Sequence, residues 1–116
     1  MTMKTSLKFL TVGLVLILSS FQLIKTQLAL TVRNELGNTE DNVKVQLFEK
    51  EEDYLKEANA VAEGVTDAKG IVKFKELKSM PYYVLARKGD KDNSGGGEQI
   101  GKLEANRINK ATVVIQ

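Results

Sequence analysis

The stretch that decides the fold is VTDAKGIVKFKEL, residues 65–77, in which a turn signal leads directly into an alternating segment. Asp67 and Gly70 are typical of a tight turn, because Asp can accept a hydrogen bond from the backbone two residues on and Gly tolerates a positive φ. After the turn, Val72 and Phe74 alternate with two lysines. This period of two predicts a strand with one face in the core and the other in solvent. The stretch therefore indicates a turn and strand of a sheet rather than a functional site.

The same alternation recurs along the rest of the chain from Leu28 onward. Short alternating runs bounded by Gly, Asn and Asp predict six strands, at 28–34, 43–49, 71–77, 82–88, 99–103 and 108–116. A seventh strand is expected around 61–66. Most of the connections are too short for the helices that parallel crossovers usually contain. The pattern therefore predicts an all-β, seven-strand antiparallel sandwich. In the strand at 82–88, we expect Tyr82, Val84 and Ala86 to share the inner face.

One segment, EKEEDYLKEANAVAEG at 49–64, breaks the β pattern. Tyr54, Ala58 and Val61 stand at i, i+4 and i+7, a spacing that predicts a short helical insert near 49–60 with one apolar face. The acidic residues of the segment alternate with lysines and indicate a solvated helix face. A glycosidase carboxylate pair would need a cleft, which a sandwich of this size rarely offers.

The first residues have the character of a secretory signal. Two lysines precede the uncharged run FLTVGLVLIL at 9–18, and two serines follow it. We expect a signal peptide over 1–27, cut between 20 and 27, with an uncleaved membrane anchor as the alternative. The sandwich domain is then 28–116, and its 14 basic and 15 acidic residues give no electrostatic reason to bind nucleic acid. Contact with a membrane is expected only through a retained anchor, and the location is periplasmic, cell-surface or secreted.

The missing residue types restrict the chemistry. The chain has no His and no Cys, and so lacks the usual general base, the thiolate nucleophile and the commonest zinc ligands. Ser79 and Ser94 do not lie in the Gly-x-Ser-x-Gly pattern of a nucleophile elbow. We therefore expect no enzyme, no catalytic residue and no cofactor.

The loop GDKDNSGGGE at 89–98 invites comparison with a calcium site. Asp90, Asp92 and Ser94 fit the first three ligand positions of an EF-hand, but the twelfth position is Gly101, where a bidentate Glu is needed. A flexible hairpin loop with Gly at its tip is the preferred interpretation. A looser oxygen cage that uses Glu98 stays open as the alternative, and no metal site is assigned.

Aromatic residues offer the other candidate site. Tyr82 and Tyr83 are adjacent, so their side chains face opposite sides of a strand. With Tyr82 inward, Tyr83 lies on the outer face with Leu85. The candidate binding face consists of Tyr83, Tyr54 and Phe48, and a carbohydrate-binding role requires that these rings form one exposed cluster.

The strand and turn residues together resemble the carboxypeptidase regulatory-like domain, which has a prealbumin (transthyretin-like, Ig-like) sandwich fold. The resemblance covers roughly 28–88 and rests on Gly37; Val43, Val45 and Leu47; Thr66, Asp67 and Gly70; Phe74 and Leu77; Tyr82, Val84 and Ala86. The segments 49–64 and 89–98 depart from the family pattern. The chain also resembles small exported single-domain proteins of Bacteroidetes type.

The family motif is a folding motif and implies no catalytic residue. We expect a non-enzymatic exported interaction or accessory module whose partner is a protein or a cell-envelope glycan. A carbohydrate-binding module that acts through exposed aromatic residues is the alternative. The two segments that depart from the family are where the function is expected.

Overall fold

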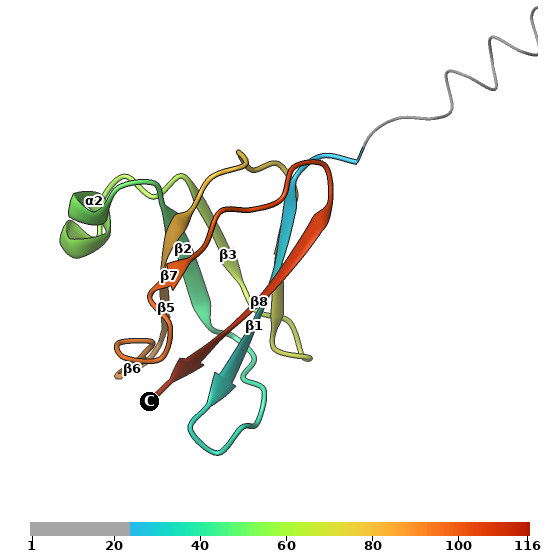
Figure 1. Ribbon diagram of the computed structural model, residues 1–116. Helices are drawn as coiled ribbons and strands as arrows, with labels where there is room; N and C mark the ends of the chain where they lie inside the picture. Colours follow the sequence, from blue (N-terminus) through green and yellow to red (C-terminus); the bar gives the residue numbers. More distant parts are fainter. Residues whose placement is uncertain (1–23) are drawn as a thin grey trace, which may run out of the picture.

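The computed structural model describes residues 24–116, so most of the expected signal peptide lies outside the described residues (Figure 1). The elements are β1 (Gln27–Asn34), β2 (Lys44–Phe48), α2 (Glu51–Lys56), β3 (Ala62–Val65), β4 (Ile71–Phe74), β5 (Tyr82–Lys88), β6 (Lys91–Asp92), β7 (Gln99–Ile100) and β8 (Ile108–Ile115). Within these residues, no helix has the length and the apolar character needed to cross a membrane.

The strands form two sheets that face each other across one core. The smaller sheet has the order β4-β1-β8, and the larger has β3-β2-β5, with β6 and β7 pairing with opposite ends of β5. The chain is therefore an all-β sandwich with a single short helical insert, as the sequence predicts. The strand expected around 61–66 is present as β3.

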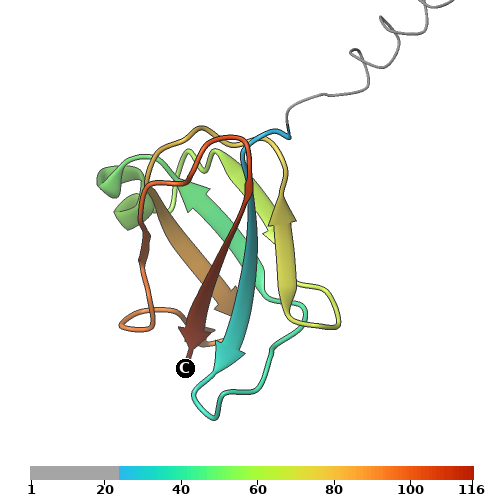
Figure 2. The same ribbon diagram turned by 45° about the vertical axis from the view of Figure 1, so that its right-hand side comes forward.

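One strand pair departs from the antiparallel expectation. β1 and β8 run parallel over eight residues, from Gln27 opposite Ile108 to Asn34 opposite Ile115. Figure 2 shows the two strands side by side and pointing the same way. The intervening chain builds the second sheet and so acts as the crossover, which removes the need for a connecting helix.

The core contains the residues that alternation assigns to it. Val72 and Phe74 are buried on β4, and Tyr82, Val84 and Ala86 are buried on β5. Fourteen buried residues form one cluster, to which both sheets contribute. Because apolar burial is the main stabilising term in folding, this cluster is what holds the two sheets together.

The corner at 67–70 is built as its sequence predicts. The Asp67 carboxylate accepts hydrogen bonds from the backbone N–H of Lys69 at 2.9 Å and of Ile71 at 3.1 Å. Gly70 has a φ of 77°, which favours glycine. A Cβ at this position would also lie 2.7 Å from that of Thr39.

The sandwich begins slightly before the expected boundary at Leu28. Thr26 is 8% exposed, and its backbone carbonyl accepts a hydrogen bond from the N–H of Leu77. Its hydroxyl accepts another from the N–H of Asn106. A cut near Ser20 would leave these contacts intact, whereas a cut after Thr26 would remove them. The cleavage itself remains a prediction.

The helical insert is shorter than its apolar spacing predicts. α2 ends at Lys56, and Glu57 follows in the left-handed conformation with its N–H bonded to the carbonyl of Tyr54. Val61 is 49% exposed and Ala58 is exposed, so the expected apolar helix face is wrong beyond Tyr54. The reason is that β3 starts at Ala62 and pairs with β2, which requires the chain to leave the helix early.

Candidate functional site

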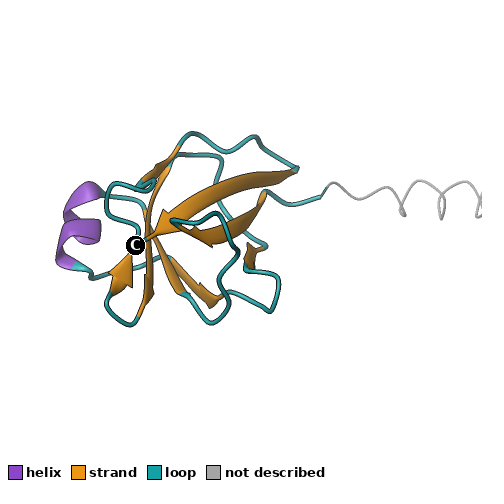
Figure 3. Cartoon of the chain, turned by 90° about the horizontal axis from the view of Figure 1, so that it is seen from below, coloured by secondary structure: helices purple, strands orange, loops and turns teal. Residues whose placement is uncertain are grey.

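The two segments that depart from the family pattern meet at one groove. The groove has a volume of about 600 Å³ and lies between α2 and the chain that follows β6. α2 packs against β2 and β5, and Figure 1 shows it on the far side of these strands from β1 and β8. In Figure 3 the helix lies at one side of the strands. Tyr54, Tyr83 and Glu98 line the groove together with Glu51, Leu55, Ser94 and Gln99. The sequence placed the candidate function in these segments, and the fold brings them side by side.

Three aromatic rings pack together at this groove, and two of them, Tyr54 and Tyr83, line it. The rings of Phe48 and Tyr54 meet edge to face with centroids 6.0 Å apart, and those of Tyr54 and Tyr83 stack at 5.8 Å with 27° between their planes. Phe48 and Tyr83 are register partners on β2 and β5, and α2 places Tyr54 against both. Such aromatic pairs add to the energy of burial.

The cluster is less exposed than the sequence interpretation required. Phe48 is 0% exposed because Tyr54 and the sheet cover it, and Leu85, expected on an outer face in solvent, is also buried. Tyr54 and Tyr83 are half-buried and line the groove. An exposed three-ring face is therefore wrong, and the accessible aromatic surface belongs to two tyrosines. Whether they bind a ligand remains a prediction.

The end of α2 is tied to β5 by an ion pair. The Arg87 guanidinium donates to both carboxylate oxygens of Glu57, at 2.6 and 3.3 Å. This hydrogen bond lowers the pKa of Glu57 and raises that of Arg87. Both side chains are nearly half exposed, so the pair orients the end of the insert more than it stabilises the fold.

The groove is polar and acidic in character. Glu51 and Glu98 stand among its lining residues, and none of the described lining residues is basic. Burial, followed by the charge of Glu98, raises the pKa of Tyr54, which keeps its hydroxyl protonated at neutral pH. Carboxylates accept hydrogen bonds and attract cations, and ring faces accept cations or sugar C–H groups. The groove therefore suits a ligand that donates hydrogen bonds or carries positive charge.

The loop at 89–98 is not the free glycine-tipped hairpin that was expected. Asn93 is 0% exposed; its side-chain oxygen accepts from the N–H of Ala86, and its side-chain nitrogen donates to the carbonyls of Val84 and Gly97. Gly96 also accepts a hydrogen bond from the N–H of Val114 at 2.9 Å. The loop is thus held against β5 and β8, and this anchoring fixes one wall of the groove.

Asn93 is the residue that sequence reasoning missed. It lies in an Asp-x-Asp-Asn-Ser run that suggested calcium ligands, but its side-chain amide is buried and hydrogen-bonds to the backbone of Ala86, Val84 and Gly97. Asp92 accepts a hydrogen bond from the N–H of Ser94 at 3.0 Å. Across residues 24–116, the structure contains no group of three or more side chains placed to hold a metal ion. Ion binding by this loop stays an untested alternative.

Comparison with known proteins supports the fold alone. No family model matches the chain, and no curated protein is a significant match. Among solved structures, the TIE protein of Bacillus anthracis matches with a TM-score of 0.55 and 20% identity, over 80% of this chain and 16% of that one. The group B streptococcus pilus 2b backbone protein matches with a TM-score of 0.51 and 15% identity, over 78% of this chain and 40% of that one.

These matches define the class of protein. The chain is an all-β sandwich of the Ig-like type, and it spans less than half the length of either neighbour. At this level of identity, the shared architecture carries no ligand or partner across. The carboxypeptidase regulatory-like resemblance is neither matched by a family model nor replaced by another family.

Proposed function

We propose that this protein is a non-enzymatic, exported β-sandwich module that binds a protein partner of the cell envelope through the groove between α2 and the 94–99 segment. The observation that carries the proposal is the stacked pair Tyr54–Tyr83, flanked by Glu51 and Glu98. Aromatic side chains beside fixed polar groups are the usual composition of a protein-binding hot spot. The groove selects a partner surface that presents lysine, arginine or amide groups.

Four further observations support the exported, non-enzymatic role. The first residues have the pattern of a signal peptide, and the chain lacks His and Cys. The strand and turn residues resemble the carboxypeptidase regulatory-like domain, whose motif is a folding motif. One structural neighbour is by its name a pilus backbone protein, so a sandwich of this shape occurs in an extracellular assembly.

The test is a capture experiment with the full chain on the envelope fraction of its own cells. Wild type should retain a protein that Glu98→Lys loses, because the reversed charge repels a basic partner. Glu52→Lys, which makes the same charge reversal on α2 but outside the groove lining, is the matched control and should retain it. Equal capture by all three proteins would contradict the proposed site.

A carbohydrate ligand is the second candidate, and the same two tyrosines favour it. Sugar rings stack on aromatic faces while carboxylates accept hydrogen bonds from sugar hydroxyls. The chain has no Trp and three Tyr, so its intrinsic fluorescence comes mainly from tyrosine, and two of the three tyrosines line the groove. A protease-treated envelope glycan fraction should quench this fluorescence if the glycan interpretation holds. Capture that disappears after protease treatment, without quenching, favours the protein partner.

A further inference from the structure

The edges of the two sheets face each other along two sides of the sandwich. These two sides differ in how closely the edge strands approach each other. On one side, β3 of the larger sheet lies against β4 of the smaller. Gly64 is so close to β4 that a Cβ there would come 2.6 Å from the Val72 side chain. This side leaves no room for another chain.

On the other side, β8 is the edge strand of the smaller sheet. Gly96 lies against the backbone of Val114, and Gly97 lies close to Val113 and to the Thr112 carbonyl. The N–H of Val114 donates to the carbonyl of Gly96, and that of Gln116 donates to the carbonyl of Asp92. Both amides therefore point away from β1. Since alternate residues of a strand direct their backbone groups to the same edge, those of Thr112 and Lys110 point outward too.

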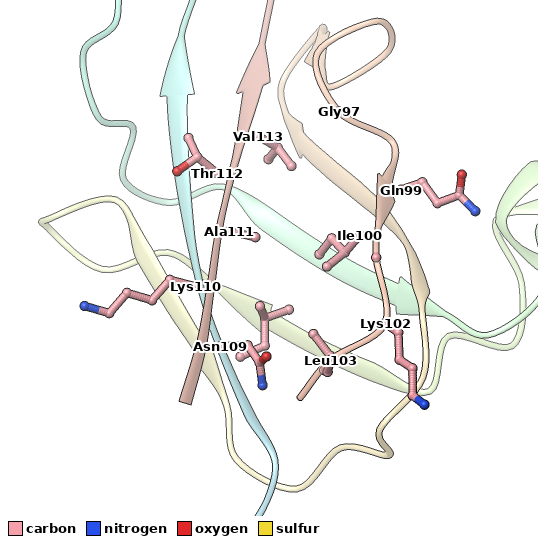
Figure 4. Close-up of a pocket in the computed structure, with 12 residues that line it drawn as sticks. Gly97, Gln99, Ile100, Lys102, Leu103, Asn109, Lys110, Ala111, Thr112 and Val113 are labelled. Atoms are coloured by element: carbon pink, nitrogen blue, oxygen red, sulfur yellow. The ribbon is translucent and has the colours of Figure 1, made fainter. Parts of the chain in front are cut away.

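The outward backbone groups of Lys110 and Thr112 have no backbone partner among residues 24–116. A groove of about 400 Å³ runs beside them, between β8 and the 99–103 segment. Figure 4 shows Ile100 and Leu103 on one wall, and Ala111 and Val113 on the other. The open edge from 108 to 112 is about 16 Å long at the usual rise of a strand.

The lining of this groove is apolar inside and basic at the rim. The buried core residue Leu28 lies at its floor, and the wall residues Leu103 and Val113 are also buried core residues. Lys102 and Lys110 point away from the floor in Figure 4, and the described lining residues include no Asp or Glu. A strand placed beside β8 would alternate apolar side chains toward the core with side chains on the outer face of the smaller sheet, where exposed Lys110 lies and acidic residues are favoured; Lys102, on the opposite wall, adds positive charge to the rim.

We propose that the open edge of β8 is a strand-addition site for an extended peptide segment that alternates apolar and acidic residues. The added strand hydrogen-bonds to the backbone of Lys110 and Thr112, extends the smaller sheet from three strands to four and fills the groove against Ile100 and Leu103. Main-chain hydrogen bonds supply affinity in this recognition mode, and alternate side chains supply specificity. Gln99 lines both this groove and the tyrosine groove, but the backbone groups of β8 that would bind the added strand do not line the tyrosine groove.

Amide hydrogen exchange of the ¹⁵N-labelled full chain, kept in a mild detergent, tests the proposal. In the free protein, the amides of Lys110 and Thr112 should exchange fast while those of Ala111 and Val113 are protected. A seven-residue probe peptide of alternating glutamate and valine should then slow the exchange of Lys110 and Thr112 by tenfold or more. A probe of alternating lysine and valine should have no such effect.

Variants distinguish the contribution of the β8 backbone groups from that of the charges of Lys102 and Lys110. Thr112→Pro removes an outward N–H that does not bond to β1, at a position where edge strands tolerate proline, and should abolish protection by the acidic probe. Retained protection of the Ala111 and Val113 amides shows that the variant stays folded. Reversal of both rim charges, Lys102→Glu with Lys110→Glu, should shift the preference to the basic probe. Lys73→Glu, an exposed lysine on the edge strand β4, is the matched control and should leave the preference unchanged.

Three results would overturn the proposal. Protection of Lys110 and Thr112 in the free protein would mean that the edge is already covered; if that protection rises with protein concentration, the occupant is a second copy of the chain. The absence of protection by the acidic probe at millimolar concentration would exclude strand addition of this chemistry. Equal protection by both probes would exclude the role of the lysines.

Discussion

The ring of Tyr54 on α2 stacks on the ring of Tyr83 on β5, with centroids 5.8 Å apart, and so closes the insert over the outer face of the larger sheet. α2 has six residues and no buried side chain, and a helix of this length does not persist alone in water. The stack and the Arg87–Glu57 pair are therefore what position the helix. This contact therefore holds one wall of the groove in place.

Truncation of Tyr54 to alanine should destabilise the protein by about 1–3 kcal/mol, because it removes a half-buried ring and uncovers Phe48. Urea unfolding measures the change. Leu55→Ala, at the neighbouring helical residue with a 69% exposed side chain, should change stability by less than about 0.5 kcal/mol. Equal losses in the two variants would mean that the ring contact contributes no more than an exposed neighbouring side chain, since alanine does not lower the helix propensity at either position.

Substitution of Gly64 by alanine should destabilise by about 1–3 kcal/mol, because the new methyl group overlaps the Val72 side chain at the closed side of the sandwich. Gly101→Ala is the matched control, since a Cβ there meets nothing within 4 Å. Thermal unfolding of both variants compares them directly. A neutral Gly64→Ala would show that β3 and β4 separate at little cost.

The unfolding free energy should fall when the pH is lowered through the carboxylate range. Hydrogen bonds from the N–H groups of Ile71 and Lys69 lower the pKa of Asp67 below its ordinary value of 3.8, and hydrogen bonds also lower those of Glu40, Glu57, Glu76 and Asp92. An acid with a lower pKa in the folded state binds fewer protons there. Its contribution is present above the unfolded pKa and is lost as the pH falls through the folded one.

The variant Asp67→Asn isolates one member of this group. Asparagine can still accept both backbone hydrogen bonds but does not titrate, so the decline of melting temperature between pH 5 and pH 2 should be shallower than in wild type. Asp90→Asn, at an exposed position of the 89–98 loop, should keep the wild-type slope. Identical slopes in all three proteins would remove Asp67 from the acid response.

The parts of the fold that follow from local chemistry could be predicted from the sequence. The Asp67–Gly70 corner depends on hydrogen bonds within four residues, and the burial of Val72 and Phe74 depends on a period of two. The parallel pairing of β1 with β8 could not be predicted in this way, because it joins residues about 80 positions apart and has no local signal. The end of α2 at Lys56 is likewise set by the pairing of β3 with β2.

The candidate site could be predicted only in part, because the contacts that build it also join residues far apart in the sequence. Tyr54 and Tyr83 were identified as exposed aromatic residues, and their proximity required the fold. Phe48 was placed in solvent by strand alternation, which takes no account of a helix that covers the outer face. Asn93 was read as a loop residue because its three partners, at Ala86, Val84 and Gly97, are visible only in three dimensions.

Removal of the Phe74 ring by Phe74→Ala should cost about 3–5 kcal/mol, as expected for a buried aromatic residue. Chemical denaturation measures it, with the exposed neighbour Lys73→Ala as a control that should cost less than about 0.5 kcal/mol. A loss below about 1 kcal/mol would mean that β4 contributes little to the core.

Replacement of Asn93 by alanine should both destabilise the protein and loosen the groove. The change leaves the N–H of Ala86 and the carbonyls of Val84 and Gly97 without their side-chain partner, at a cost of about 1–3 kcal/mol. Hydrogen exchange of the Ala86 amide should accelerate more than the global loss of stability explains, because the opening is local. Ser94→Ala, one residue on and exposed, should change neither quantity. If the Ala86 amide stayed as protected in Asn93→Ala as in wild type, the loop would be held to β5 by the Gly96–Val114 contact alone.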